Sequence, residues 1–222
     1  GGEVGLITEE EINKALAPLL KTRFKLGMFD PEKMNPYSSI SADVINSEEH
    51  QRLAKEAALK SMVLLKNDEV LPLRNDLARY FITGPNATSI EAILGNYHGI
   101  NPSLTTYVEG IAGRVAPGSQ LQYRKGFLLD RKNVNPIDWM TGAAQSSDVI
   151  FVVMGINTLL EGEEGASIAS QYFGDRLEYQ LPQNQIDFLK KLRNGYDKPI
   201  IAVITGGSPM DLSEVHKLAD AV

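Results

Sequence analysis

Three glutamates that could do acid/base chemistry stand within four positions: Glu161, Glu163 and Glu164. Three carboxylates this close repel one another, and crowding by like charge raises the pKa of a carboxyl group. A general acid at neutral pH needs a raised pKa, and the glycines among the glutamates let the backbone turn a side chain toward a substrate. A solvated acidic loop explains the same pattern, and the residues alone favour that simpler interpretation.

The other patterns that could carry catalysis are weaker. The Gly-Gly-Ser stretch at 206–208 lacks the Gly-x-Ser-x-Gly spacing of a nucleophile elbow. The turn at 84–87 has neither phosphate-loop nor dinucleotide-binding spacing, so no cofactor is expected. Three histidines lie far apart in the sequence, which argues against a metal site. They are His50, His98 and His216.

Three further features receive structural interpretations. Trp139 falls in a predicted helix and is assigned to the core rather than to a sugar-binding platform. Asp175 and Arg176 are interpreted as an ion pair that holds the loop. Residues 86–88 match a glycosylation sequon, Asn-Ala-Thr, but this pattern is too short to carry an argument.

Composition excludes several classes of function. The chain has 222 residues, 43% hydrophobic and with a formal net charge of −6, and no basic stripe that would favour nucleic acid as a partner. It has no cysteine, which excludes disulfides and cysteine-bound zinc. No apolar run approaches about 18 residues, so no membrane-spanning helix is expected.

Strands alternating with helices predict a doubly wound α/β domain with a mostly parallel sheet over residues 78–222. Ligands bind such sheets beyond the carboxyl ends of the strands, which directs attention to the loops 84–88, 155–176 and 205–212. A helix begins near residue 213 and no strand is predicted after it, so the sheet is expected to be cut short. The predicted strands are 80–83, 121–123, 149–154 and 199–204, and the predicted helices lie near 89–94, 106–115, 137–144 and 185–192.

The first 65 residues follow a different pattern. A capping box at Thr8 to Glu11 begins a helix whose apolar residues have helical spacing, and this helix is expected to end near Gly27. Residues 31–46 are predicted to be an extended linker, and a second helix runs from Ser47 to about residue 60. The apolar run at 62–65 is predicted to be buried, as a helix end or a strand.

Several motifs, in order along nearly the whole chain, resemble family-3 glycoside hydrolases. Phe24 to Asp30 resembles the end of the family's barrel domain, and Ala57 to Asn67 with Leu71-Pro72-Leu73 is similar to the start of its second domain. The remaining motifs resemble that domain's loops and strand ends: Ile82 to Ala87, Leu94 to Gly99, Leu160 to Glu164 with Asp175-Arg176, Leu181-Pro182 with Gln185, and Gly207 to Leu212.

This resemblance implies a domain organisation. Residues 1–30 would be the terminal helix of a (β/α)8-type barrel that is otherwise outside this chain, and 31–46 the linker. Residues 47–222 would form an incomplete second domain, a three-layer α/β sandwich. The partners implied are the N-terminal barrel of the same protein and a β-linked glycoside, with no role for nucleic acid or membrane.

The family further implies a retaining mechanism on the nonreducing end of β-linked sugars, of β-xylosidase or β-glucosidase type. An aspartate on the barrel would be the nucleophile, so none is named here and this chain alone is expected to be inactive. Matching Gly162-Glu163 to the family's Gly-Glu favours Glu163 as acid/base, Glu161 is the alternative and Glu164 comes third. A non-catalytic α/β module that binds a sugar or another ligand, or only supports a barrel, remains the competing interpretation.

Overall fold

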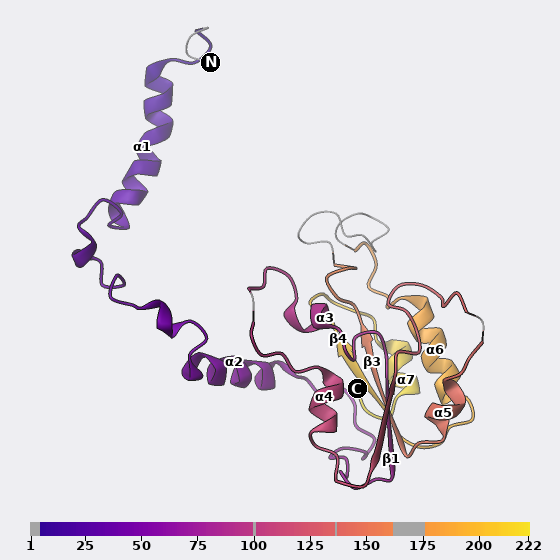
Figure 1. Cartoon of the computed structure of the whole chain (residues 1–222). Helices are drawn as coiled ribbons and strands as arrows, with labels where there is room; N and C mark the ends of the chain where they lie inside the picture. The colour runs from indigo at the N-terminus through magenta and orange to yellow at the C-terminus, as the bar shows by residue number, and fades with distance from the viewer. Residues whose placement is uncertain (1–4, 100, 136, 162–175) are drawn as a thin grey trace. The chain divides into compact units, whose positions relative to one another are not determined.

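The computed structural model of the chain describes residues 5–99, 101–135, 137–161 and 176–222. The chain divides into two compact units, Gly1–Val63 and Leu64–Val222 (Figure 1). The predicted boundaries after residues 30 and 46 both lie inside the first unit. The assignment of residues 47–63 to the second domain therefore stays a prediction.

The first unit contains two helices, α1 (Glu9–Lys25) and α2 (Glu48–Ser61). The capping box forms as expected, because the Thr8 hydroxyl accepts from the Glu11 N–H while the Glu11 carboxylate accepts from the Thr8 N–H. Neither helix has a buried residue. The segment between them is not simply extended, because it contains the short 3₁₀ helices η2 (Glu32–Met34) and η3 (Ala42–Val44).

The apolar run at 62–65 is not buried, which corrects the prediction. Its side chains are 55–71% exposed. Helix α2 ends at Ser61, and from Leu65 onward the segment is held through its backbone. The N–H groups of Leu65 and Lys66 both donate to the Val222 carbonyl, at 2.8 and 3.2 Å. The hydrophobic composition of this run predicted burial, but the contacts that hold its end are backbone hydrogen bonds to Val222.

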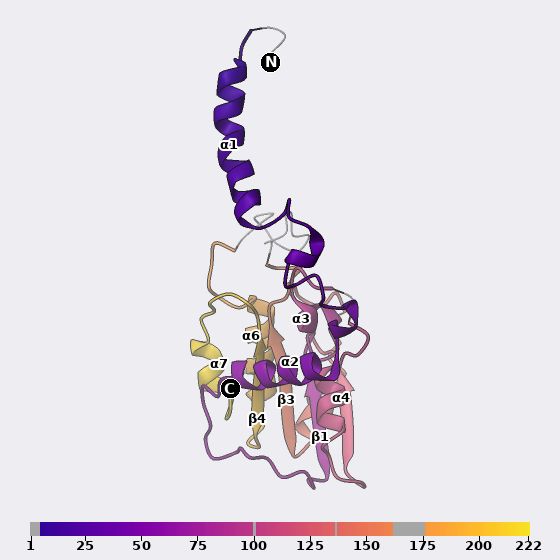
Figure 2. The same ribbon diagram turned by 90° about the vertical axis from the view of Figure 1, so that its left-hand side faces the viewer.

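The second unit is built on a parallel sheet with the strand order β2-β1-β3-β4. Figures 1 and 2 show the strands running side by side through the middle of this unit. Each predicted strand is confirmed, with its ends moved by at most one residue. The strands are β1 (Arg79–Thr83), β2 (Gln120–Arg124), β3 (Val149–Gly155) and β4 (Ile200–Thr205).

Helices cover both faces of this sheet, with α3 and α4 on one side and α5 and α6 on the other (Figure 1). The alternation of side chains along β3 explains the two layers, because Val152 packs with the α5 to α7 cluster and Val153 packs with residues of α4. The doubly wound α/β fold is therefore as predicted. The helices are α3 (Ile90–Leu94), α4 (Tyr107–Ala112), α5 (Thr141–Gln145), α6 (Gln183–Arg193) and α7 (Ser213–Leu218).

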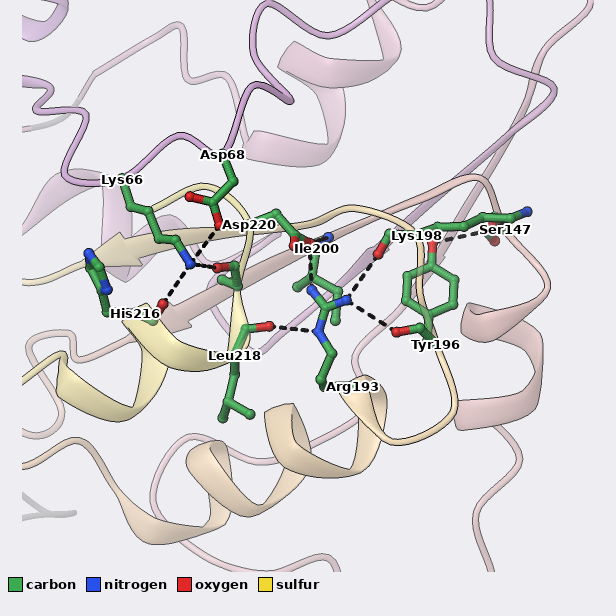
Figure 3. Close-up of polar contacts among 11 residues, drawn as sticks. Lys66, Asp68, Ser147, Arg193, Tyr196, Lys198, Ile200, His216, Leu218 and Asp220 are labelled. Carbon is green, nitrogen blue, oxygen red and sulfur yellow. Dashed lines mark hydrogen bonds and ion pairs between the residues drawn. The ribbon is translucent and has the colours of Figure 1, made fainter.

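No strand follows α7 among the described residues, as expected, but the short segment after this helix makes isolated bridge pairs. Ala221 pairs in parallel with Ile201 of β4 and antiparallel with Asn67. Figure 3 shows the polar contacts that hold this region. The Lys66 ammonium donates to the carbonyls of His216 and Ala219, and the Arg193 guanidinium donates to the Leu218 carbonyl. Helix α7 thus leads to a segment in which Ala221 makes single bridge pairs beside β4.

Helix α5 is shorter than predicted, and this places Trp139 differently. The helix begins at Thr141, because the Asp138 carboxylate accepts from the N–H groups of Met140 and Thr141 and makes a local turn before it. Trp139 lies in that turn and is 79% exposed. Its assignment to the core was wrong.

Candidate functional site

Three strand ends meet at the carboxyl edge of the sheet, as expected for this fold. Asn86 follows β1, Asn157 follows β3 and Thr205 ends β4, and all three are buried. The Asn86 side-chain amide donates to the Thr205 hydroxyl at 2.7 Å, and the Asn157 side-chain amide donates to the side-chain oxygen of Asn86 at 3.3 Å. Asn86 is therefore a structural link between loops, a role that its turn sequence did not reveal.

Two glycines let the strands pack closely at this edge. Gly84 has a φ of +114°, and a Cβ placed there would lie 1.9 Å from the Val153 carbonyl oxygen. Gly155 has a φ of +124°, and a Cβ there would lie 2.1 Å from the Thr205 carbonyl oxygen. Any side chain at either position would push neighbouring backbones apart. The start of the 155–176 loop is thus fixed by backbone packing.

Gln185 of α6 fixes the same loop from the other face. Its side chain is fully buried. The side-chain oxygen accepts from the Gly155 N–H at 2.8 Å, and the side-chain nitrogen donates to the carbonyls of Gly155 and Leu129, both at 2.7 Å. The glutamine therefore satisfies both polar groups of Gly155 at the point where β3 ends.

Glu161 lies six residues beyond Gly155, at the end of a turn in which its N–H donates to the Asn157 carbonyl. Its carboxylate accepts from the Gly207 N–H at 3.0 Å. Gly207 belongs to the segment between β4 and α7, so this contact joins two of the three predicted loops. The side chain is partly exposed.

Glu161 borders two hollows. One, of about 330 Å³, is lined by residues of α3 and of the loop after it, by the turn after β3 and by Gly206 and Gly207; exposed Glu91 and Tyr97 belong to this lining. The pKa of Glu91 is lowered because its own backbone N–H and the Ser89 hydroxyl donate to the carboxylate. The second hollow, of about 340 Å³, is lined by residues of the 176–179 and 207–209 segments.

Of the three predicted glutamates, only Glu161 lies within the described residues. Glu163 and Glu164 fall outside them, as does Asp175 of the proposed ion pair. Arg176 donates through Nη2 to the carbonyls of Glu178 and Gln180, at 2.7 and 3.1 Å. Its buried Nη1 has no hydrogen-bond partner among the residues that the structure describes.

The loop therefore has two anchors on the same segment. On the N-terminal side the anchor is the hydrogen bond from Gly207 to Glu161. On the C-terminal side, the Asp211 N–H donates to the Tyr179 carbonyl at 2.8 Å, and Gln180 pairs with Asp211. Both anchors lie at the carboxyl edge, where the fold places ligands.

Within the described ranges, no three His, Asp or Glu side chains come close enough together to hold a metal ion. No helix in those ranges is both long and apolar enough to span a bilayer. The side chains that the described residues bring together at the edge of the sheet are a carboxylate, amides and a hydroxyl.

Comparison with known proteins identifies the domain. The family described as the glycosyl hydrolase family 3 C-terminal domain matches residues 62–222. This chain belongs to glycoside hydrolase family 3. A probable exo-1,4-beta-xylosidase of Aspergillus clavatus is 32% identical over 209 residues, covering 94% of this chain and 25% of the relative. Probable beta-D-xylosidase 7 of Arabidopsis thaliana is 30% identical over 211 residues, covering 93% and 26%.

Solved family-3 structures have the same fold. An exo-beta-xylosidase, XlnD, in complex with a xylobiose aziridine probe superposes with a TM-score of 0.77 at 28% identity, covering 99% of this chain and 27% of that one. A beta-glucosidase of Listeria innocua in complex with glucose gives 0.71 at 21% identity, covering 99% and 28%, a likeness of fold. The chain thus spans about a quarter of the length of the relatives it matches.

Proposed function

We propose that this chain is part of a retaining, exo-acting β-glycosidase, of β-xylosidase or β-glucosidase type, that removes sugars from the nonreducing end of β-linked glycosides. The observation that carries this proposal is the 30–32% identity to named xylosidases along more than nine-tenths of the chain. An N-terminal barrel in the same protein would supply the nucleophile. The present chain would supply the acid/base glutamate from the 155–176 loop.

In such a mechanism two carboxyl groups lie about 5–5.5 Å apart on either side of the scissile bond. The nucleophile attacks the anomeric carbon while the acid/base protonates the leaving oxygen. The same glutamate then removes a proton from the water that releases the sugar. The acid/base must therefore come within hydrogen-bond reach, about 2.6–3.2 Å, of the glycosidic oxygen.

We assign the acid/base role to Glu163, with Glu161 as the alternative. The contact of Glu161 supports this order, because its carboxylate already accepts from the Gly207 N–H at 3.0 Å. A carboxylate held by another loop suits an anchor better than a proton donor that must reach a substrate. Glu161 would then fix the base of the loop that carries Glu163.

The test compares alanine substitutions of Glu161, Glu163 and Glu164 in the complete enzyme. For Glu163→Ala we expect kcat/KM on a disaccharide to fall by about 10²–10⁴, the usual contribution of general acid catalysis. The glycosylation step of a nitrophenyl glycoside should fall much less, because that leaving group needs little protonation. Azide needs no general base, so it should restore turnover of the nitrophenyl substrate and give a β-glycosyl azide.

The results of these assays distinguish between the possible assignments of the acid/base residue. Azide rescue in Glu161→Ala alone would move the acid/base to Glu161. Wild-type disaccharide turnover in all three variants would refute an acid/base in this loop and favour a supporting, non-catalytic role. The 222-residue chain by itself should not hydrolyse aryl β-xylosides or β-glucosides, and turnover above a buffer control would contradict the division of the site between this chain and a barrel.

A further inference from the structure

A third hollow lies away from the Glu161 site. It has a volume of about 740 Å³, and it is lined by residues from the end of β2, the segment before α5, and α6. It shares no lining residue with either hollow beside Glu161. Two aromatic or apolar side chains, Met140 and Phe188, form part of its wall. Nothing in the proposed glycosidase mechanism uses it.

Trp139 stands in the lining of this hollow with 79% of its surface exposed. Its position is held by the neighbouring Asp138, whose carboxylate accepts from the N–H groups of Met140 and Thr141 and forms an ion pair with Lys191 of α6. An indole ring combines a large apolar face with one polar N–H, which suits it to contact a partly polar ligand. Two amides, Asn133 and Asn135, share the lining.

Cationic side chains also outnumber acidic ones in the lining of the hollow, in a chain whose formal net charge is −6. Together with the adjoining hollow lined by Phe127 and Phe188, it carries five cationic side chains and only two acidic ones, Asp138 and Asp187. Arg131 contacts Asp130, and Lys125 lies close enough to Glu91 to affect that carboxylate. The cationic residues are Arg124, Lys125, Arg131, Lys132 and Lys191.

We propose that this hollow is a second carbohydrate-binding site, which takes an acidic oligosaccharide that carries a uronic acid. A sugar ring would stack on the indole of Trp139, and its hydroxyls would bond with Asn133 and Asn135. The uronate carboxylate would be bound by the cationic rim formed by Arg124 and Lys125. A neutral sugar would use the ring and the amides but would leave the excess positive charge unmatched.

Trp139 is the only tryptophan in the chain, so intrinsic fluorescence reports directly on this hollow. The chain is titrated with xylotriose that carries one glucuronic acid, with unsubstituted xylotriose, and with a single-stranded oligonucleotide of similar charge. The acidic saccharide should shift the emission to shorter wavelength and protect it from iodide quenching, with affinity at least severalfold above that of the neutral one. Raising the salt from about 0.01 M to about 1 M shortens the Debye length from about 30 to about 3 Å and should remove that advantage.

Substitutions locate the binding. Arg124→Gln and Lys125→Gln should each weaken the acidic saccharide about two- to fivefold, as for other exposed ion pairs, and leave neutral xylotriose unchanged. Trp139→Ala, followed by calorimetry because the reporter is lost, should weaken both saccharides about tenfold. Arg114→Gln is the matched control, since Arg114 is another exposed arginine and precedes the opposite end of β2.

Three results would overturn the proposal. The first is absence of any fluorescence response to the acidic saccharide in a chain whose circular dichroism shows it is folded. The second is equal affinity for the acidic and neutral saccharides, which would remove the role of the charge. The third is equal or tighter binding of the oligonucleotide, which would make the hollow a general site for polyanions. These measurements do not involve hydrolysis, so their failure would leave the glycosidase proposal intact.

Discussion

The contacts of Gln185 predict a large loss of stability on its substitution. Gln185→Leu keeps most of the side-chain volume but removes three hydrogen bonds to backbone groups, two at Gly155 and one at Leu129. Each hydrogen bond makes a net contribution of about 1 kcal/mol to the free energy of unfolding, so the substitution should lower that free energy by about 3 kcal/mol. The Gly155 groups left behind are buried, so water cannot easily replace their lost partner. For a domain with a total stability of about 5–15 kcal/mol this is a substantial fraction.

The assay is urea unfolding of the chain followed by circular dichroism, with the slope of free energy against urea expected to stay unchanged. Gln183→Leu is the matched control. Gln183 lies on the same helix, is exposed, and bonds only to Asp187 one turn later, so its loss should cost within about 0.5 kcal/mol. A cost below about 1 kcal/mol for Gln185→Leu, or an equal cost for the control, would refute the role assigned to this glutamine.

Three further predictions concern single positions. Asn86 should remain unglycosylated in a secretory host despite its sequon, because its amide is buried and bonded to a hydroxyl; mass spectrometry would detect a glycan. Gly84→Ala should lower the free energy of unfolding by more than about 2 kcal/mol, while Gly142→Ala, in open space within α5, should raise it by up to about 1 kcal/mol. Hydrogen bonds from two lysines lower the pKa of Glu214 to about 2; its stabilisation should therefore be complete above pH 4.5 and lost as the pH falls toward 2, and Glu214→Gln should abolish that part of the pH dependence of urea unfolding.

The sheet was predictable because its strands are short and separated by helices, and because three of the four are mostly apolar. The run at 149–154 is almost entirely buried, and a strand covered on both faces must be apolar along its whole length. The location of the candidate site at the carboxyl edge followed from the same reasoning, because the loops that follow parallel strands all lie at one edge of the sheet. Asn86, Asn157 and Thr205 meet there as the topology requires. The sequence pattern therefore predicted the edge of the sheet at which the candidate site lies.

The misplaced elements share a physical cause. Trp139 falls in a helix that was predicted to begin near residue 137, but the Asp138 carboxylate accepts local backbone hydrogen bonds and delays the helix to Thr141. The run at 62–65 was assigned to the interior by composition. Its backbone instead pairs with Val222, more than 150 residues away. The sequence pattern around these residues reflects only their local preference. It carries no information about a competing side-chain acceptor or about a backbone partner far away in the sequence.

The same limit applies to the three glutamates, of which the structure describes only Glu161. Glu161, Glu163 and Glu164 are equivalent in sequence terms, since each is a carboxylate in the same acidic stretch. Glu161 is distinguished by a hydrogen bond from Gly207, a residue 46 positions away. That contact ties the loop to the segment that also holds its other end through Asp211. A loop fixed at both ends can present a carboxylate with less loss of conformational entropy than a free one. Under the proposed assignment, an anchoring Glu161 and a catalytic Glu163 are therefore complementary, because the first would make the second easier to position.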